Sequence, residues 1–225
     1  MSSSSIGQIR TAVIVTGGDA PAPESLAHLP GAGPMVVIGA DSGVGYARAL
    51  GLGVDIAVGD FDSIDPHVLE SIEGEGIDIR RHPVDKDATD LELALEVALE
   101  LGVSEILLIG GHGGRLDHLL GNAMVLASDR YASVAVRAVM GDAIVTIVRP
   151  GREFELQGTA GEYVSVIAVH GHAEDVHLVG LEWPLSGAAL RPGSTLGISN
   201  RFIDTVARVR VGSGTLLIIQ PGVST

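Results

Sequence analysis

Apolar residues come in short runs over the first two thirds of the chain, and these runs alternate with segments of helical periodicity. Each run is rich in Val and Ile and is bounded by glycine or polar residues, which is typical of strands buried in a parallel sheet. We predict strands at residues 11–16, 35–39, 56–58, 77–81, 106–109 and 134–139. The alternation predicts an α/β fold, a mostly parallel sheet with helices on both faces.

The clearest helical pattern lies at residues 90–101. Its apolar residues recur at the i, i+3, i+4 spacing of a helix with one buried face, at Leu91, Ala94, Leu95, Ala98 and Leu101. Thr89 and Glu92 predict a capping box at its start. Weaker patterns predict helices at 43–50, 66–73 and 116–128, and the proline-rich segment 21–34 predicts a loop or an irregular helix.

The pattern changes after Pro150, where short β-rich segments are separated by glycine. We predict strands at 153–157, 163–170, 207–211 and 215–220, with no helical stretch of useful length between them. This is typical of a small antiparallel sandwich or barrel. We therefore predict an α/β domain at residues 1–149 and an all-β domain at residues 150–225.

Composition narrows the range of functions. The chain has 225 residues, of which 46% are hydrophobic, so it can bury a sizeable core. The net charge of −14 repels nucleic acid and anionic membranes, and no basic patch offsets it. The chain lacks cysteine, a signal-peptide pattern and any apolar run near the roughly 20 residues of a membrane helix. We expect a cytoplasmic protein with no nucleic-acid or membrane partner.

Two acidic clusters, at residues 59–63 and 86–90, carry the candidate chemistry. In extended backbone, Asp60 and Asp62 point the same way while Phe61 points inward. Carboxylates and phosphate oxygens complete the octahedron that Mg²⁺ prefers, so the clusters predict a Mg²⁺-nucleotide site. An Asp-x-Asp pair after a strand is also common in a capped turn.

Other polar residues follow neighbouring predicted strands, where open α/β sheets bind ligands. Asp41 follows the strand at 35–39, and a glycine-rich run with Arg115 and Asp117 follows the strand at 106–109. Glycines let backbone N–H groups approach phosphate, and Arg115 and Lys86 supply positive charge. Taken singly, Asp41 and Asp117 fit helix N-caps and Lys86 fits a solvated charge.

The second domain offers two weaker candidates. His170, His172 and His177 lie close in sequence, but no fourth zinc ligand is evident, so we favour a surface loop. Trp183, the only tryptophan, fits either a stacking platform for a cationic heterocycle or a plug in the core or in an interface.

Ordered sequence blocks carry a resemblance to a known family, thiamine pyrophosphokinase, over nearly the whole chain. The blocks are Ala40-Asp41-Ser42-Gly43, GDFDS at 59–63, KDATD at 86–90, GGRLDH at 113–118 with Asn122, Gly180-Leu181-Glu182-Trp183-Pro184-Leu185 and Gly197-Ile198-Ser199-Asn200. The resemblance implies a catalytic α/β domain, a β-sandwich that binds thiamine, Mg²⁺ dependence, and a homodimer with active sites between subunits.

The resemblance also implies roles for particular residues. Asp60, Asp62 and Asp90 correspond to magnesium ligands and, with Arg115 and Asp117, make up the implied catalytic set. The implied nucleotide and diphosphate shell contains Asp41, Lys86, Thr89, Arg115 and Asp117. Ser199 and Asn200 match the thiamine-contacting pair. Two departures are Ser42, where many relatives have glycine, and Gly197, where some have serine.

The implied reaction is attack of the thiamine hydroxyl on the β-phosphorus of ATP, which gives thiamine diphosphate and AMP. Asp41 and Asp117 are the candidates for a general base. Three alternatives remain open: a pyrophosphokinase for another hydroxymethyl heterocycle such as a pterin, a non-catalytic nucleotide or thiamine-binding regulator, and a metal-dependent phosphohydrolase. The Ser199-Asn200 pair in a β-rich domain favours thiamine over a pterin.

Overall fold

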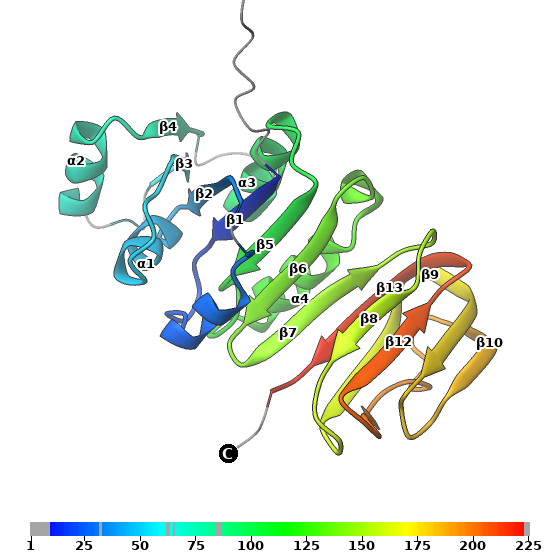
Figure 1. Ribbon diagram of the computed structural model, residues 1–225. Coiled ribbons are helices and arrows are strands. Elements are labelled where there is room, and N and C mark those ends of the chain that lie inside the picture. The colour runs from blue at the N-terminus through cyan, green and yellow to red at the C-terminus, as the bar shows by residue number, and fades with distance from the viewer. Residues whose placement is uncertain (1–9, 32, 62–63, 65, 84–86, 223–225) are drawn as a thin grey trace, which may run out of the picture. The chain divides into compact units, whose positions relative to one another are not determined.

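The computed structural model describes residues 10–31, 33–61, 64, 66–83 and 87–222 (Figure 1). The chain divides into two compact units. The first comprises Met1–Asn122 and Ser133–Gly141, and the second comprises Ala123–Ala132 and Asp142–Thr225. The domain bounds predicted from the sequence, 1–149 and 150–225, stay a prediction.

The first unit contains a parallel sheet. Its strands lie in the order β4-β3-β2-β1-β5-β6, and every neighbouring pair is parallel. Their bounds are β1 Thr11–Val15, β2 Met35–Ala40, β3 Ile56–Gly59, β4 Asp78–Arg81, β5 Glu105–Ile109 and β6 Ala135–Met140. All five residues of β1 are buried, as expected of a central strand covered on both faces.

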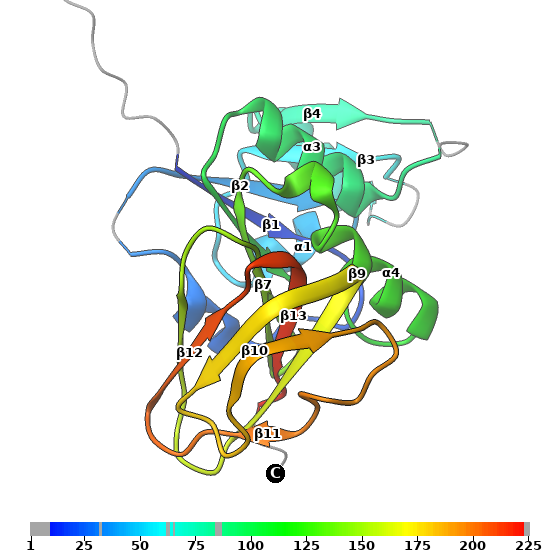
Figure 2. The same ribbon diagram turned by 90° about the vertical axis from the view of Figure 1, so that its right-hand side faces the viewer.

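Helices cover both faces of this sheet. The α-helices are α1 Gly43–Ala49, α2 Pro66–Gly74, α3 Asp90–Glu100 and α4 Leu116–Leu126, and η1 Pro23–His28 is a 3₁₀-helix. On one face, Ala47 of α1 packs with Val13 of β1, Val37 of β2 and Leu107 of β5. Side chains alternate between the two faces along a strand, so these three point to the same face. Helix α3 packs on β1, β2 and β3, and Figure 2 shows α1 and α3 on opposite sides of β1 and β2. The α/β fold predicted from periodicity is confirmed.

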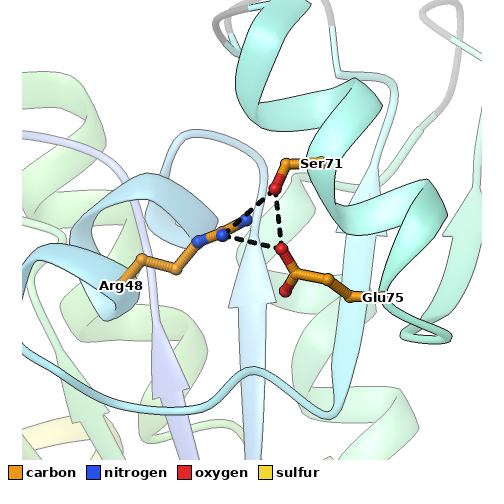
Figure 3. A network of polar contacts seen from close by, with 3 residues as sticks. All are labelled: Arg48, Ser71 and Glu75. Atoms are coloured by element: carbon orange, nitrogen blue, oxygen red, sulfur yellow. Dashed lines mark hydrogen bonds and ion pairs between the residues drawn. The ribbon is translucent and has the colours of Figure 1, made fainter.

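A polar network ties α1 to the end of α2 (Figure 3). Nη2 of Arg48 donates to Oγ of Ser71 at 3.2 Å and to Oε1 of Glu75 at 2.8 Å, and the Ser71 hydroxyl donates to the same carboxylate at 2.6 Å. The Ser71 hydroxyl lowers the pKa of Glu75, and Arg48 adds to that effect. The network holds α2, which follows the first acidic cluster, against α1.

The second unit is built from antiparallel strands. Their bounds are β7 Ala143–Val148, β8 Phe154–Gln157, β9 Tyr163–Val179, β10 Leu185–Leu190, β11 Asn200–Arg201, β12 Val206–Arg210 and β13 Ser213–Gln220, and η2 Asp129–Tyr131 is a short 3₁₀-helix. β9 pairs with β11 and β13 along its first part and with β10 and β12 along its last part (Figure 2). A core that includes Val166, Leu178 and Phe202 fills the space between the strands. The predicted all-β sandwich or barrel is confirmed.

Strand β9 is longer than predicted, because it continues past residue 170 to Val179. His170 and Asp175 have positive φ angles of 59° and 53°, and Gly171 has a φ of 142°. These positions bend the strand without ending it, so its first part pairs with β11 and β13 and its last part with β10 and β12. The histidines of the predicted surface loop therefore lie on a strand, and that part of the prediction was wrong.

The C-terminal end of α4 is held within the second unit by two basic side chains. Arg149 Nη2 donates to the carbonyl oxygens of Ala127 and Ser128 at 2.9 and 2.8 Å, and Nε2 of His170 lies 2.8 Å from the carbonyl oxygen of Met124. Burial lowers the pKa of Arg149. Across the described part of the chain, no helix has the length and apolar character needed to span a membrane.

Candidate active site

Four parallel strands of the first unit end at one edge of the sheet. Their last residues are Val15 of β1, Ala40 of β2, Gly59 of β3 and Ile109 of β5. β1 lies between β2 and β5, so the chain order reverses beside it. In open α/β sheets this carboxyl edge, close to such a reversal, is where ligands bind.

Three elements that carry acidic residues come together around Gly59. A Cβ placed on Gly59 would lie 3.3 Å from Oδ1 of Asp90 and 3.3 Å from the Cα of Asp41. Asp60 follows directly and is half-buried. The sheet edge thus gathers Asp41 from the end of β2, Asp60 from the end of β3 and Asp90 from the start of α3, as the sequence predicted.

Two non-glycine residues near Gly59 have positive φ angles: Asp41, which is its neighbour in space, and Phe61, which follows two residues later. Asp41 has a φ of 48°, and its N–H donates to the carbonyl of Val58 at 2.8 Å. Phe61 has a φ of 61° and is buried, with the Arg81 guanidinium 5.5 Å from its ring centroid. Positive φ at a non-glycine residue costs about 1–3 kcal/mol and is common at functional sites. Burial of Phe61 confirms that this side chain packs inward.

The start of α3 is capped as predicted. Thr89 has extended backbone and its Oγ1 accepts a hydrogen bond from the Glu92 N–H at 3.2 Å. Asp90 lies in the first turn of the helix, where the macrodipole favours a carboxylate. Asp62 and Lys86, the two other residues predicted for these clusters, lie outside the described residues.

Glycine-rich loops after β1 and β5 are joined by backbone hydrogen bonds. Thr16 N donates to Ile109 O at 3.1 Å, Gly111 N to Gly17 O at 3.0 Å and Asp19 N to His112 O at 2.8 Å. These bonds extend the alignment of β1 and β5 beyond the strands, so main-chain hydrogen bonds join the two loops at the chain reversal.

Two of these glycines are required by the close approach of the loops. A Cβ on Gly18 would lie 2.1 Å from the carbonyl oxygen of His112, and one on Gly110 would lie 2.6 Å from that of Thr16. Tyr46 of α1 donates its hydroxyl to Gly18 O at 3.0 Å, and Asn122 of α4 donates to Gly111 O at 3.0 Å. The loop after β1 was missed by the sequence analysis, although Gly17-Gly18-Asp19 follows an apolar strand just as the predicted run at 110–114 does.

Arg115 and Asp117 form a bidentate ion pair at the start of α4. Nη2 of Arg115 lies 2.6 Å from Oδ2 of Asp117, and Nε donates to Oδ1 at 3.2 Å. The hydrogen bond from Arg115 lowers the pKa of Asp117 to about 2 and raises that of Arg115. Both side chains are exposed, so the remaining guanidinium N–H groups are open to an anion.

Both departures from the family pattern fit their surroundings. A Cβ on Gly17 would lie 2.7 Å from Oγ of Ser42, so glycine at 17 accommodates the serine at 42. Gly197 has a φ of 101°, and a Cβ there would lie 2.6 Å from the carbonyl oxygen of Val166. The backbone at 197 therefore requires glycine.

In the second unit, Ser199 and Asn200 differ sharply in exposure. Ser199 is exposed, has a φ of 57°, and its N–H donates to Oγ of Ser165 at 3.1 Å. Asn200 is 1% exposed, and its side chain bonds to the backbone of Trp183. Trp183 is 54% exposed, which excludes the core plug and leaves a stacking platform or an interface contact.

The histidines of β9 have protein partners or face solvent. Nε2 of His177 lies 2.7 Å from Oδ1 of Asp175, while His172 is exposed. Among the described residues, no group of three or more His, Cys, Asp and Glu side chains is gathered closely enough to hold a metal ion. Asp62, one of the three predicted magnesium ligands, lies outside those residues, so this statement does not include it.

Comparisons with known proteins connect both units to one family. The model of the thiamin pyrophosphokinase catalytic domain matches residues 33–137, and that of the thiamin pyrophosphokinase vitamin B1 binding domain matches residues 151–216. Thiamine pyrophosphokinase of Bacillus subtilis is 32% identical over 184 residues, which are 81% of this chain and 86% of that protein.

Solved structures agree with this result. The crystal structure of Bacillus subtilis thiamine pyrophosphokinase has a TM-score of 0.82 at 29% identity and covers 96% of this chain and 100% of its own. That of the Geobacillus thermodenitrificans enzyme has a TM-score of 0.79 at 30% identity and covers 96% and 99%. With matched models in both units and a bacterial relative aligned over most of both chains, the chain belongs to the thiamine pyrophosphokinase family.

Proposed function

We propose that this chain transfers the pyrophosphoryl group of ATP to the hydroxyl of thiamine, giving thiamine diphosphate and AMP. The observation that carries the proposal is the gathering of Asp41, Asp60 and Asp90 around Gly59 within the region matched by the catalytic-domain model. The exposed Trp183 and Ser199 lie in the region matched by the vitamin B1 binding model. The chain is an enzyme of the thiamine diphosphokinase type, and we propose that its donor site and its acceptor site lie on different units.

Mg²⁺ is the metal we propose, held by Asp60, Asp62 and Asp90. The donor set fits the ion, because carboxylates are oxygen ligands and the approach of Asp90 to Gly59 brings its Oδ1 next to the backbone that carries Asp60. When bound, Mg²⁺ neutralises charge on the phosphate oxygens of ATP. Asp62 lies outside the described residues, so its part in this set rests on the sequence.

The phosphates of ATP are assigned to the loop edge and the start of α4. Arg115 is oriented by Asp117 and presents its free N–H groups to a diphosphate, while Lys86 adds a point charge. Asp41 and Thr89 complete the proposed shell. The Thr89 hydroxyl already caps α3, so it holds the helix end that carries Asp90.

Transfer of this kind depends on in-line positioning and on neutralisation of charge more than on covalent help. The acceptor hydroxyl attacks the β-phosphorus, the bond to the α-phosphate oxygen breaks, and AMP leaves with its charge stabilised by Arg115. Of the two candidate bases, Asp117 has both carboxylate oxygens bonded to Arg115, which lowers its pKa to about 2 and leaves it less available to a proton. Asp41 is therefore our choice for the group that receives the hydroxyl proton.

Thiamine is assigned to the face of the second unit around β11. Trp183 presents an exposed indole there, and aromatic faces attract cationic rings such as a thiazolium. Ser199 offers a hydroxyl from a strained backbone position.

We further propose a homodimer in which the donor site of one subunit and the acceptor site of the other form each active site. We also propose that the protein is cytoplasmic, because its proposed reaction requires ATP.

The decisive assay incubates the purified chain with Mg²⁺, ATP and thiamine and measures AMP and thiamine diphosphate together. Both products are expected in equal amounts. Reaction with a pterin alcohol instead would favour the rival pyrophosphokinase, nucleotide binding without AMP would favour a regulator, and phosphate release without an acceptor would favour a phosphohydrolase.

Asp90→Asn tests the metal site. We expect kcat/KM to fall about 10²–10³-fold, as when a group that stabilises transition-state charge is removed. Asp78→Asn is the matched control, because Asp78 lies at the opposite, amino-terminal end of β4, where it pairs with Arg80 at 3.0 Å. Equal turnover in Asp90→Asn and in the control would remove Asp90 from the ligand set.

A further inference from the structure

The side chain of Asn200 bonds to the protein through both its oxygen and its nitrogen. Its Oδ1 accepts from the N–H groups of Trp183 at 3.0 Å and Arg201 at 2.9 Å, and its Nδ2 donates to the Trp183 carbonyl at 2.8 Å. An amide oxygen accepts two hydrogen bonds, so that atom is saturated. Only 1% of the residue is exposed, so Asn200 presents almost no surface to a substrate.

The backbone that Asn200 holds is fixed from several sides. Glu182 N donates to Arg201 O at 2.8 Å, and Leu181 forms a β-bridge with Phe202. Gly180, with a φ of 81°, lets the chain pass so close to β12 that a Cβ there would lie 2.4 Å from the carbonyl oxygen of Val206. These contacts anchor the three residues that precede Trp183.

On this anchored backbone Trp183 is 54% exposed. A large aromatic side chain on fixed backbone binds a ligand at low entropic cost, because the main chain loses no freedom on binding. The hydrogen bonds of Asn200 to both the N–H and the C=O of Trp183 supply much of that fixation.

We infer that Asn200 is a positioning residue for the acceptor: it contacts no acceptor atom and acts entirely through Trp183, whose backbone it clamps. The inference rests on the proposed function for the identity of the acceptor. It reassigns Asn200 from the substrate-contacting pair predicted from the sequence and leaves Ser199 and Trp183 as the residues that face the acceptor.

A double-mutant cycle tests the inference. Asn200→Ala, Trp183→Ala and the double variant are compared for thiamine KM, ATP KM and kcat. We expect Asn200→Ala to raise thiamine KM about tenfold, with ATP KM within about twofold of wild type, since up to three hydrogen bonds around one segment are lost. In the Trp183→Ala background, Asn200→Ala should change thiamine KM less than about twofold, because the group through which it acts is gone.

Trp183 also provides an optical signal, because it is the only tryptophan of the chain. Asn200→Ala should shift the emission maximum and raise quenching by acrylamide. Gln220→Ala is the control: it removes an amide hydrogen bond to a carbonyl, Gln157 O at 2.8 Å, in the same unit and should leave emission and KM unchanged. This measurement needs no substrate, so it can test the link between Asn200 and Trp183 even if the proposed reaction is not observed.

Multiplicative effects of the two single variants on thiamine KM would overturn the inference, because they would mean that Asn200 contacts the acceptor directly. Unchanged emission together with unchanged thiamine KM in Asn200→Ala would overturn it as well. If Asn200→Ala does not fold, Asn200→Ser takes its place in the same cycle, since it leaves a small polar group at this buried site without adding a charge and still removes the amide bonds to Trp183. Loss of AMP formation by the wild type with both substrates present would instead refute the proposed function.

Discussion

Replacement of Gly43 by alanine probes how closely α1 approaches the sheet. Gly43 is the first residue of α1, and a Cβ there would lie 2.0 Å from the carbonyl oxygen of Val15 and 2.7 Å from the Cα of Thr16. Ordinary contact begins near 3.4 Å, so the helix start must withdraw by 3.4 − 2.0 = 1.4 Å. Both contacts are with main chain, which cannot rotate away as a side chain does.

The expected cost to stability is about 1–3 kcal/mol, typical of an added methyl group in a packed region. Activity should suffer more. Asp41 lies two residues before Gly43, and its carbonyl accepts a hydrogen bond from Val44 N at 3.1 Å. Withdrawal of the helix start therefore displaces Asp41, and a misplacement of about 1 Å in an active site can lower kcat/KM about 10²-fold.

Gly45→Ala is the matched control in the same helix. A Cβ at Gly45 meets no atom within 4 Å among the described residues, and alanine favours helix over glycine by about 1 kcal/mol, so this variant should be as stable as wild type or more so. Urea denaturation gives the free energy of unfolding, and AMP release gives kcat/KM. If Gly43→Ala matches Gly45→Ala in both measurements, the steric argument is refuted.

Three further predictions concern other positions. Arg115 lowers the pKa of Asp117 from 3.8 to about 2, so the ion pair stabilises the fold above pH 3.8 and this contribution is lost as the pH falls toward 2. An NMR titration of Asp117 should report the low pKa in the wild type and a return toward 3.8 in Arg115→Ala. Gly197→Ser should lower the free energy of unfolding by about 1–3 kcal/mol because of the positive φ, and a neutral result in urea would contradict the geometry. Thr89→Ala removes the N-cap of α3 and should cost about 1 kcal/mol, measured as a drop in Tm relative to Thr89→Ser, which keeps the hydroxyl.

Local signals in the sequence predicted the first unit well. The apolar spacing at 90–101 and the Thr89 cap identified α3, which spans Asp90–Glu100. The buried strands were recognised from their Val and Ile runs because they are covered on both faces. Their parallel order then brought Asp41, Asp60 and Asp90 to one edge, since the carboxyl ends of parallel strands share an edge.

The second unit was harder to predict, because its long strand β9 contains polar and glycine residues that are typical of loops. The polar His170-Gly171-His172 segment ended the predicted strand, whereas positive φ angles at 170 and 175 let β9 continue. β7, Ala143–Val148, lies in a stretch where no strand was predicted. Such errors follow from tertiary pairing, which a local pattern does not contain.

Side-chain roles in the candidate site were also only partly predictable. Sequence blocks named Asn200 but gave no sign that its amide faces the Trp183 backbone, because that pairing joins positions 17 residues apart. The loop at 16–19 was open to prediction, since it follows an apolar strand with two glycines. It was missed because it carries no residue of an obvious chemical type beyond Asp19.

The hydrogen-bonded loops after β1 and β5 determine which amino-acid substitutions this enzyme tolerates there. Their alignment is set by main-chain donors and acceptors, so it is independent of which side chains the loops carry. In a library that randomises this region, we expect active clones to accept many residues at Asp19 and His112. The same library should retain only glycine at Gly18 and Gly110, so the loop chemistry can be redesigned while its path stays fixed.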